Sequence, residues 1–134
     1  MKELTVDAVL ENMPRVTAFV DEQLEAFGCP PRVQAQIDVA VDELFGNIVR
    51  YAYKPGVGPA TVRAEVTEEP AVILTFIDNG VPYDPLKKED PDITLSAEER
   101  QEGGLGIFMV KKSMDEIAYE YKDGQNILQI KKKI

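Results

Sequence analysis

The strongest structural signal in this chain is the stretch VQAQIDVAVDELFGNIVRYA, residues 33–52. Its apolar side chains recur every three or four positions, which is the period of a helix that buries one face. They are Val33, Ile37, Ala40, Val41, Leu44, Phe45, Ile48 and Ala52. The stretch therefore predicts a long helix that packs along one side against the rest of the molecule.

A second helix is predicted before it, over residues 10–27. The same apolar period runs from Leu10 to Phe27. Pro14 suits the first turn of a helix, and Gly28 supplies the stop. The two helices are therefore expected to follow one another with only a short, proline-rich connector between them.

Further segments predict strands, one more helix and a tight turn. Strands are expected at residues 2–6, 61–67, 71–77, 116–121 and 126–131, a helix at 107–114 and a hairpin turn at 122–125. This order indicates an α+β fold. We expect a two-layer α/β sandwich with an antiparallel or mixed, mostly antiparallel sheet and three main helices on one face. Residues 1–134 are expected to form a single domain.

The composition excludes several classes of function. The 134 residues contain no histidine and one cysteine, Cys29. A Ser-His-Asp or Cys-His catalytic arrangement, a His-ligated zinc ion and an internal disulfide are therefore impossible within the chain. The 24 acidic and 15 basic residues give a net charge of −9, which is a poor match for nucleic acid. Neither a signal peptide nor a membrane span is apparent, so we expect a cytoplasmic protein.

Glu43 and Asn47 lie just beyond one edge of the apolar stripe of helix 33–52, about 40° apart around the helix axis. Mg²⁺ accepts an amide oxygen as a ligand while substrate phosphates and waters complete its coordination. A carboxylate beside such a site can act as a general base. We therefore consider Asn47 as a metal ligand and Glu43 as a catalytic base; the alternative is an ordinary solvated helix edge.

Asp78-Asn79-Gly80 follows the apolar strand at 71–77. Asn-Gly after a strand is typical of a hairpin turn, but the next residues include two prolines, which do not suit a returning strand. We expect a loop instead, with a hairpin as the alternative. Asp78 would accept a hydrogen bond from the amino group of a purine, and Gly80 would let a planar ligand approach.

Gly103-Gly104-Leu105-Gly106 opens the predicted helix at 107–114. Glycines let backbone N–H groups point at an anion, and a helix N-terminus adds partial positive charge. The turn matches neither the P-loop nor the dinucleotide motif, and a simple helix cap is the alternative. The charged segment before it, about residues 84–103, is expected to be a lid, with a disordered surface loop as the alternative.

Together these motifs resemble the ATP-binding fold shared by gyrase-type ATPases, sensor histidine kinases and MutL-type proteins, known as the GHKL or Bergerat fold. Residues 42–53 (DELFGNIVRYAY) resemble its N box, residues 78–80 its first glycine box and residues 103–107 its second. Within that superfamily the chain is similar to the small anti-sigma-factor serine kinases, above all at residues 103–116 (GGLGIFMVKKSMDE).

The resemblance implies roles for individual residues. It implies that Asn47 binds Mg²⁺ that bridges the phosphates of ATP, that Asp78 accepts from the adenine amino group, and that Glu43 takes a proton from the serine of a partner protein. The other ATP contacts that it implies are Gly80, Arg100, Gly103, Gly104, Leu105 and Gly106. The chain departs from the family at Tyr51, where histidine is frequent.

The resemblance also implies a function. The chain would be an ATP- and Mg²⁺-dependent protein serine/threonine kinase and anti-sigma factor. It would phosphorylate a serine of an anti-anti-sigma (STAS-type) partner and sequester a sigma factor, with the helix at 10–27 and the outer face of the sheet as contact surfaces. The alternative is a non-catalytic, ATP-dependent protein-binding switch of the same fold. A homodimer is left open, and no nucleic-acid or membrane partner is expected.

Overall fold

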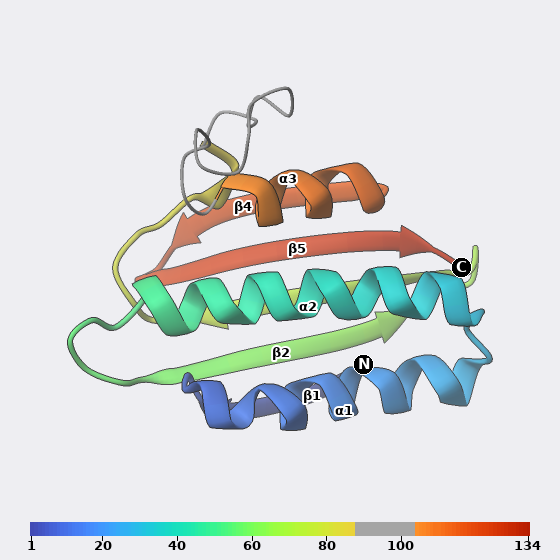
Figure 1. Ribbon diagram of the computed structural model, residues 1–134, viewed down its shortest axis with the longest axis horizontal. Coiled ribbons are helices and arrows are strands. Elements are labelled where there is room, and N and C mark those ends of the chain that lie inside the picture. The colour runs from blue at the N-terminus through green and yellow to red at the C-terminus, as the bar shows by residue number, and fades with distance from the viewer. Residues whose placement is uncertain (88–103) are drawn as a thin grey trace.

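The computed structural model describes residues 1–87 and 104–134, which fold into two layers (Figure 1). One layer is a sheet, and the other consists of helices lying across one of its faces. The elements in chain order are β1 (Lys2–Asp7), a 3-10 turn η1 (Leu10–Asn12), α1 (Met13–Phe27), α2 (Pro31–Tyr51), β2 (Pro59–Val66), β3 (Ala71–Asp78), a 3-10 turn η2 (Pro85–Lys87), α3 (Gly104–Ser113), β4 (Glu116–Lys122) and β5 (Gln125–Lys133). The predicted α+β sandwich is confirmed.

The strands of the described residues form one sheet in the order β1-β2-β3-β5-β4. Each neighbouring pair within it is antiparallel. Of the two predicted possibilities, an antiparallel and a mixed sheet, the structure therefore has the antiparallel one. β3 lies in the middle and is the most buried strand, as its nearly unbroken apolar sequence predicts. Its last residue, Asp78, pairs with Asn126 of β5 on one side and Ala60 of β2 on the other.

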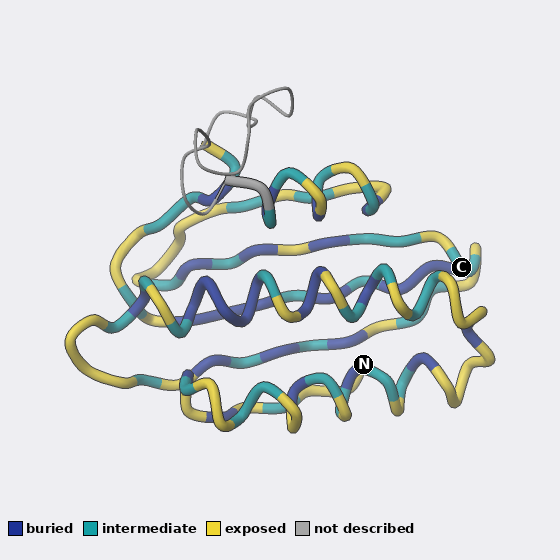
Figure 2. Tube along the Cα trace, in the orientation of Figure 1, coloured by how far each residue is buried: buried dark blue, intermediate teal, exposed yellow. Residues whose placement is uncertain are grey.

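α2 lies over the middle of the sheet between α1 and α3 (Figure 1). It buries the predicted apolar face, and Phe45 is the largest fully buried side chain in the described part of the chain. Buried positions are concentrated along α2 and the central strands (Figure 2). Because Asn47 is buried and Glu43 is half-buried, both residues lie at the border of the core rather than on a fully solvated surface.

Two chain reversals use backbone conformations that were expected from the residue types. Gly28 ends α1 with a φ of +83°, a conformation that glycine adopts without steric cost. The hairpin between β4 and β5 turns at Asp123 and Gly124, with φ values of +53° and +78°. Two successive positive φ values characterise a type I′ turn, so the predicted hairpin is confirmed.

The boundaries of two predicted helices differ from the observed ones. Residues 10–12 form the separate 3-10 turn η1, and α1 begins at Met13, so that Pro14 occupies its first turn, where a missing N–H costs nothing. α3 begins at Gly104, three residues earlier than predicted. Gly104, Leu105 and Gly106 therefore belong to the first helical turn instead of preceding it.

The residues after β3 form a loop that leads to η2, and the strands beside β3 are β2, which precedes it in the chain, and the distant β5. The loop prediction for residues 78–80 is confirmed, and the hairpin alternative is excluded. None of the described helices combines the length and the apolar composition that a crossing of the lipid bilayer requires.

Candidate functional site

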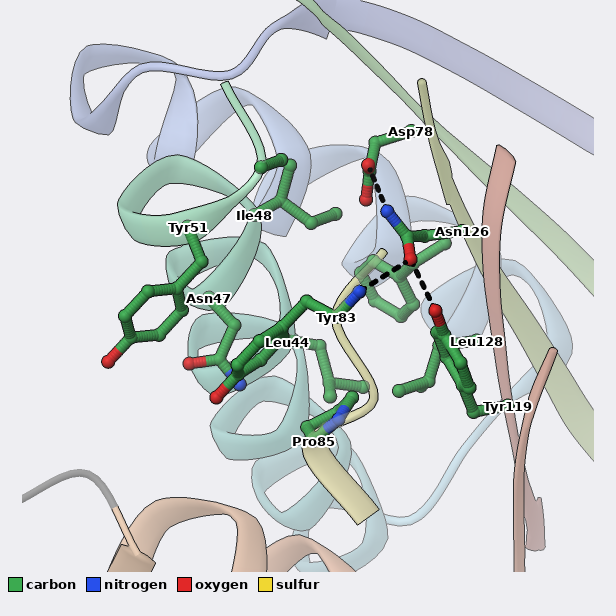
Figure 3. A pocket seen from close by; sticks show the side chains of 12 residues that line it. Leu44, Asn47, Ile48, Tyr51, Asp78, Tyr83, Pro85, Tyr119, Asn126 and Leu128 are labelled. Carbon is green, nitrogen blue, oxygen red and sulfur yellow. Dashed lines mark hydrogen bonds between the residues drawn. The ribbon is translucent and has the colours of Figure 1, made fainter. Parts of the chain in front are cut away.

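A pocket opens between α2, the ends of β3 and β5, and the loop that follows β3 (Figure 3). It is lined by Leu44, Asn47, Ile48, Tyr51, Ala52, Phe76, Asp78, Tyr83, Pro85, Tyr119, Asn126 and Leu128. Mostly apolar walls with a few polar groups are typical of small-molecule sites. Two of the residues singled out from the sequence, Asn47 and Asp78, thus line one pocket, although 31 positions separate them in the chain.

Asp78 presents a hydrogen-bond acceptor to this pocket. Its side chain is 5% exposed. Oδ1 accepts hydrogen bonds from the Gly80 backbone N–H and from Asn126 Nδ2, both at 2.9 Å, and the second carboxylate oxygen points into the pocket (Figure 3). Burial raises the pKa of the Asp78 carboxyl above its ordinary value, while the hydrogen bonds from Asn126 and Gly80 lower it.

Asn126 is a site residue that the sequence analysis missed. Its side chain is 6% exposed and connects Asp78 to the loop after β3 and to β4. One signal was present in the sequence. Residues 126, 128 and 130 point to the same side of β5, and Leu128 and Ile130 are core residues, so the buried asparagine interrupts an apolar row.

Gly80 allows the loop to pass close to the end of α2. A Cβ atom at this position would lie 2.2 Å from the backbone oxygen of Ala52, and the Val81 N–H donates to the same oxygen at 2.9 Å. The neighbour that requires glycine here is therefore the backbone of α2. The expected contact of Gly80 with a planar ligand stays a prediction.

Glu43, Asn47 and Arg50 form a polar row on α2. Arg50 Nη2 donates to Asn47 Oδ1 at 3.0 Å and lies 4.0 Å from Glu43 Oε1. A cation therefore already lies against the oxygen that was considered as a metal ligand. The described residues contain no group of three acidic, cysteine or histidine side chains that could hold a metal ion. Asn47 as a metal ligand stays a prediction: Mg²⁺ held by one protein oxygen together with phosphates and water would need the Arg50 guanidinium to leave Asn47 Oδ1.

The first turn of α3 lies against Glu43. A Cβ atom at Gly106 would come within 2.1 Å of Glu43 Oε2, so the helix N-terminus and the carboxylate of α2 are in direct contact. Gly104 and Leu105 contribute their backbone to the same turn. Two further predicted contacts, Arg100 and Gly103, lie outside the described residues.

Two tyrosines stack beside the pocket. The rings of Tyr51 on α2 and Tyr83 in the loop have centroids 4.7 Å apart and planes at 26° to each other. The Arg50 guanidinium lies 5.9 Å from the centre of the Tyr51 ring. Tyr51, which stands where the resembling family often has histidine, is thus part of an aromatic wall.

Comparison with known proteins identifies the family. Residues 6–132 match the family described as the histidine kinase-like ATPase domain, which is nearly the whole chain. The chain belongs to the histidine kinase-like ATPase family. The pocket described above is thus the candidate nucleotide site of an ATPase domain.

Two curated relatives of this histidine kinase-like ATPase domain are named protein kinases. Serine/threonine-protein kinase BtrW of Bordetella bronchiseptica is 32% identical over 98 residues, which cover 72% of this chain and 68% of that relative. Serine-protein kinase RsbW of Bacillus cereus (strain B4264) is 36% identical over 97 residues, which cover 69% of this chain and 60% of RsbW. Through these relatives the chain belongs with the serine/threonine-protein kinases of its family.

Solved structures agree on the fold. The RsbU and RsbW domains of Rv1364c from Mycobacterium tuberculosis align with a TM-score of 0.68 and 19% identity, over 99% of this chain and 32% of that one. The histidine kinase domain of the blue-light activated histidine kinase EL346 from Erythrobacter litoralis aligns with a TM-score of 0.56 and 16% identity, over 90% and 58%. At these identities the likeness establishes the histidine kinase-like fold alone.

Proposed function

We propose that this domain binds Mg-ATP in the described pocket and transfers the γ-phosphate to a serine of a STAS-type anti-anti-sigma protein. In a separate complex, the domain would bind a sigma factor and sequester it. One observation carries the proposal. Asp78 at the end of β3 and Asn47 on α2 line one pocket, and Glu43, one helical turn before Asn47, lies against the first turn of α3 at Gly106.

In this proposal, the site has groups that complement both the adenine and the phosphates of ATP. Asp78 accepts a hydrogen bond from the adenine amino group, and the apolar walls enclose the ring. The N–H groups of the first turn of α3 face the phosphates, with the partial positive charge of the helix N-terminus behind them. Asn47 holds Mg²⁺, which neutralises phosphate charge when bound. Arg100, Gly103 and Leu105 belong to the proposed ATP contacts through the family resemblance.

Phosphoryl transfer then requires one base and correct positioning. The serine oxygen of the partner forms a bond to the γ-phosphorus, the bond from that phosphorus to the β,γ-bridging oxygen breaks, and ADP leaves. Glu43 accepts the hydroxyl proton of the serine. No histidine is needed in this scheme, in keeping with the composition of the chain.

The test separates ATP binding from transfer. The wild-type chain is incubated with ATP labelled at the γ-phosphate and with an extract of the cells that express the chain. It should transfer the label to a serine of a small protein in that extract. Glu43→Gln should bind ATP as tightly as wild type and transfer label at least about 100-fold more slowly, because it removes the general base. Label transfer is followed by gel autoradiography and ATP binding by calorimetry.

The matched control is Glu65→Gln, which removes the same charge from an exposed position on β2 and should transfer label at the wild-type rate. Transfer by Glu43→Gln at that rate would contradict the role of Glu43. A wild-type chain that binds ATP and labels no protein would favour the alternative, a non-catalytic nucleotide-dependent binding switch.

A further inference from the structure

Asn126 uses its whole hydrogen-bonding capacity inside the protein. Nδ2 donates to Asp78 Oδ1 at 2.9 Å and to the Val81 backbone oxygen at 2.8 Å. Oδ1 accepts from the Tyr83 backbone N–H at 3.0 Å and from the Tyr119 hydroxyl. Two donors and two acceptors are the full set of an asparagine amide, so this side chain is held in one position.

Two backbone groups determine which way this amide points. The Val81 carbonyl can only accept a hydrogen bond, and the Tyr83 N–H can only donate one. The nitrogen of Asn126 must therefore face Val81, and its oxygen must face Tyr83. Asn126 therefore presents its NH₂ group, a donor, to Asp78. If the amide were turned by about 180°, it would lose its hydrogen bonds to both Val81 and Tyr83.

The orientation of Asn126 determines which oxygen of the Asp78 carboxylate remains available as an acceptor. Two donors, Asn126 Nδ2 and the Gly80 N–H, converge on the same carboxylate oxygen. Oδ2 is thereby left to the pocket as an acceptor (Figure 3). A base with an amino group at this point gains a hydrogen bond, whereas a base with a carbonyl there meets a second acceptor and leaves both groups unpaired.

We propose that Asn126 is a positioning residue that fixes Asp78 as an acceptor and thereby makes the site select a purine with an exocyclic amino group. The inference rests on the proposed function, because it assumes that the pocket binds a purine nucleotide. It goes beyond that function in assigning the base selectivity to a residue whose hydrogen bonds all go to Asp78, the loop after β3 and β4.

The experiment compares ATP with inosine triphosphate, in which a carbonyl replaces the 6-amino group of the purine. Both nucleotides share the ribose and the phosphates, so a general loss of structure weakens both alike and their affinity ratio reports base selection alone. Affinities are measured by calorimetry with Mg²⁺ for wild type, Asn126→Ala and Asn126→Ser. The serine variant keeps a polar group in the cavity if the alanine variant does not fold.

The matched control is Gln129→Ala. Gln129 is an exposed amide on the same strand and donates to Thr75 of β3 at 3.2 Å, so it makes a similar cross-strand contact away from the pocket. We expect the ATP preference to fall at least about tenfold in the Asn126 variants, which corresponds to the loss of one hydrogen bond to a charged group, and to be unchanged in Gln129→Ala.

Two failures are distinguishable. A wild-type chain that does not bind ATP overturns the proposed function. A wild-type chain that prefers ATP, together with a folded Asn126 variant that keeps the full preference, overturns the role of Asn126 and leaves the proposed function intact.

Discussion

At the scale of single residues, Gly106 and Glu43 approach each other closely. The glycine has space for hydrogen alone, because a Cβ atom would overlap the carboxylate. The absence of a side chain at 106 therefore lets the N-terminus of α3 lie directly against the proposed base. This contact would place the proposed phosphate-binding turn beside the proposed base.

Gly106→Ala should push the Glu43 carboxylate away from the N-terminus of α3. Alanine favours helix, so we expect no loss of thermal stability from the backbone, whereas the displaced Glu43 carboxylate should slow label transfer about 100-fold, the effect of a displacement of roughly 1 Å at a reacting group. Transfer rates and melting temperatures are compared with Gly56→Ala, whose added Cβ would lie 3.4 Å from the Tyr53 oxygen. Equal transfer rates in the two variants would contradict the proposed positioning.

The sequence was sufficient to single out Asp78, Asn47 and Glu43, since each stands out locally, at a strand end or at the edge of an apolar stripe. Asn126 and Tyr119 were not predicted, because their importance arises from contacts across the sheet. Asn126 meets Asp78 over a separation of 48 positions, which depends on the pairing of β3 with β5. Local patterns do not determine which distant strands become neighbours.

At the scale of elements, α1 and α2 meet in a seam that carries two carboxyl groups. Asp21 Oδ1 and Asp38 Oδ1 are buried and have no hydrogen-bond partner among the residues that the structure describes. Burial, with further contributions from Asp21, Asp42 and Glu25, raises the pKa of Asp38 to about 7. A proton shared between Asp21 and Asp38 would satisfy both oxygens.

This seam makes stability depend on pH. The raised pKa means that the folded state disfavours the ionised carboxyl, so the penalty is absent below about pH 4 and grows as pH rises towards 7. Asp38→Asn stays neutral at every pH. It should raise the free energy of unfolding at pH 8 by on the order of 1 kcal/mol, with allowance for solvent screening, and raise it clearly less at pH 5, where only part of the penalty is present, as measured by urea unfolding.

Glu11→Gln serves as the control for this seam, because it removes one negative charge at an exposed position in η1. A gain from Asp38→Asn that is equal at pH 5 and pH 8 would contradict the shared proton and indicate a simple change in net charge.

The elements themselves were predictable because periodicity reports burial directly. The apolar stripes of α1 and α2 and the apolar run of β3 each match one observed element. The ends were less predictable. At Leu10–Asn12 and at Gly104–Gly106 the choice between 3-10 turn, α-helix and loop rests on a few backbone hydrogen bonds, which the apolar pattern does not report.

At the scale of the whole molecule, three helices on one face of an antiparallel sheet leave a pocket between α2 and the ends of the central strands, and α3 begins beside Glu43 of α2. The net charge of −9 opposes a triphosphate, so in the proposed complex Mg²⁺ and the N-terminus of α3 would supply the local compensation. In the same proposal, Asp78 would recognise the base.

The central claim is tested most directly by urea unfolding with and without Mg-ATP. At a hundredfold excess of nucleotide over its dissociation constant, we expect the wild-type chain to gain about 2.7 kcal/mol. Asp78→Asn should gain nothing, because Gly80 and Asn126 hold the new amide by its oxygen and turn its N–H₂ group towards the adenine amino group. Asp123→Asn, which removes the same charge at the β4–β5 hairpin, should gain as much as wild type. A wild-type chain that Mg-ATP does not stabilise, or an equal gain in Asp78→Asn, would contradict the claim that this pocket binds ATP through Asp78.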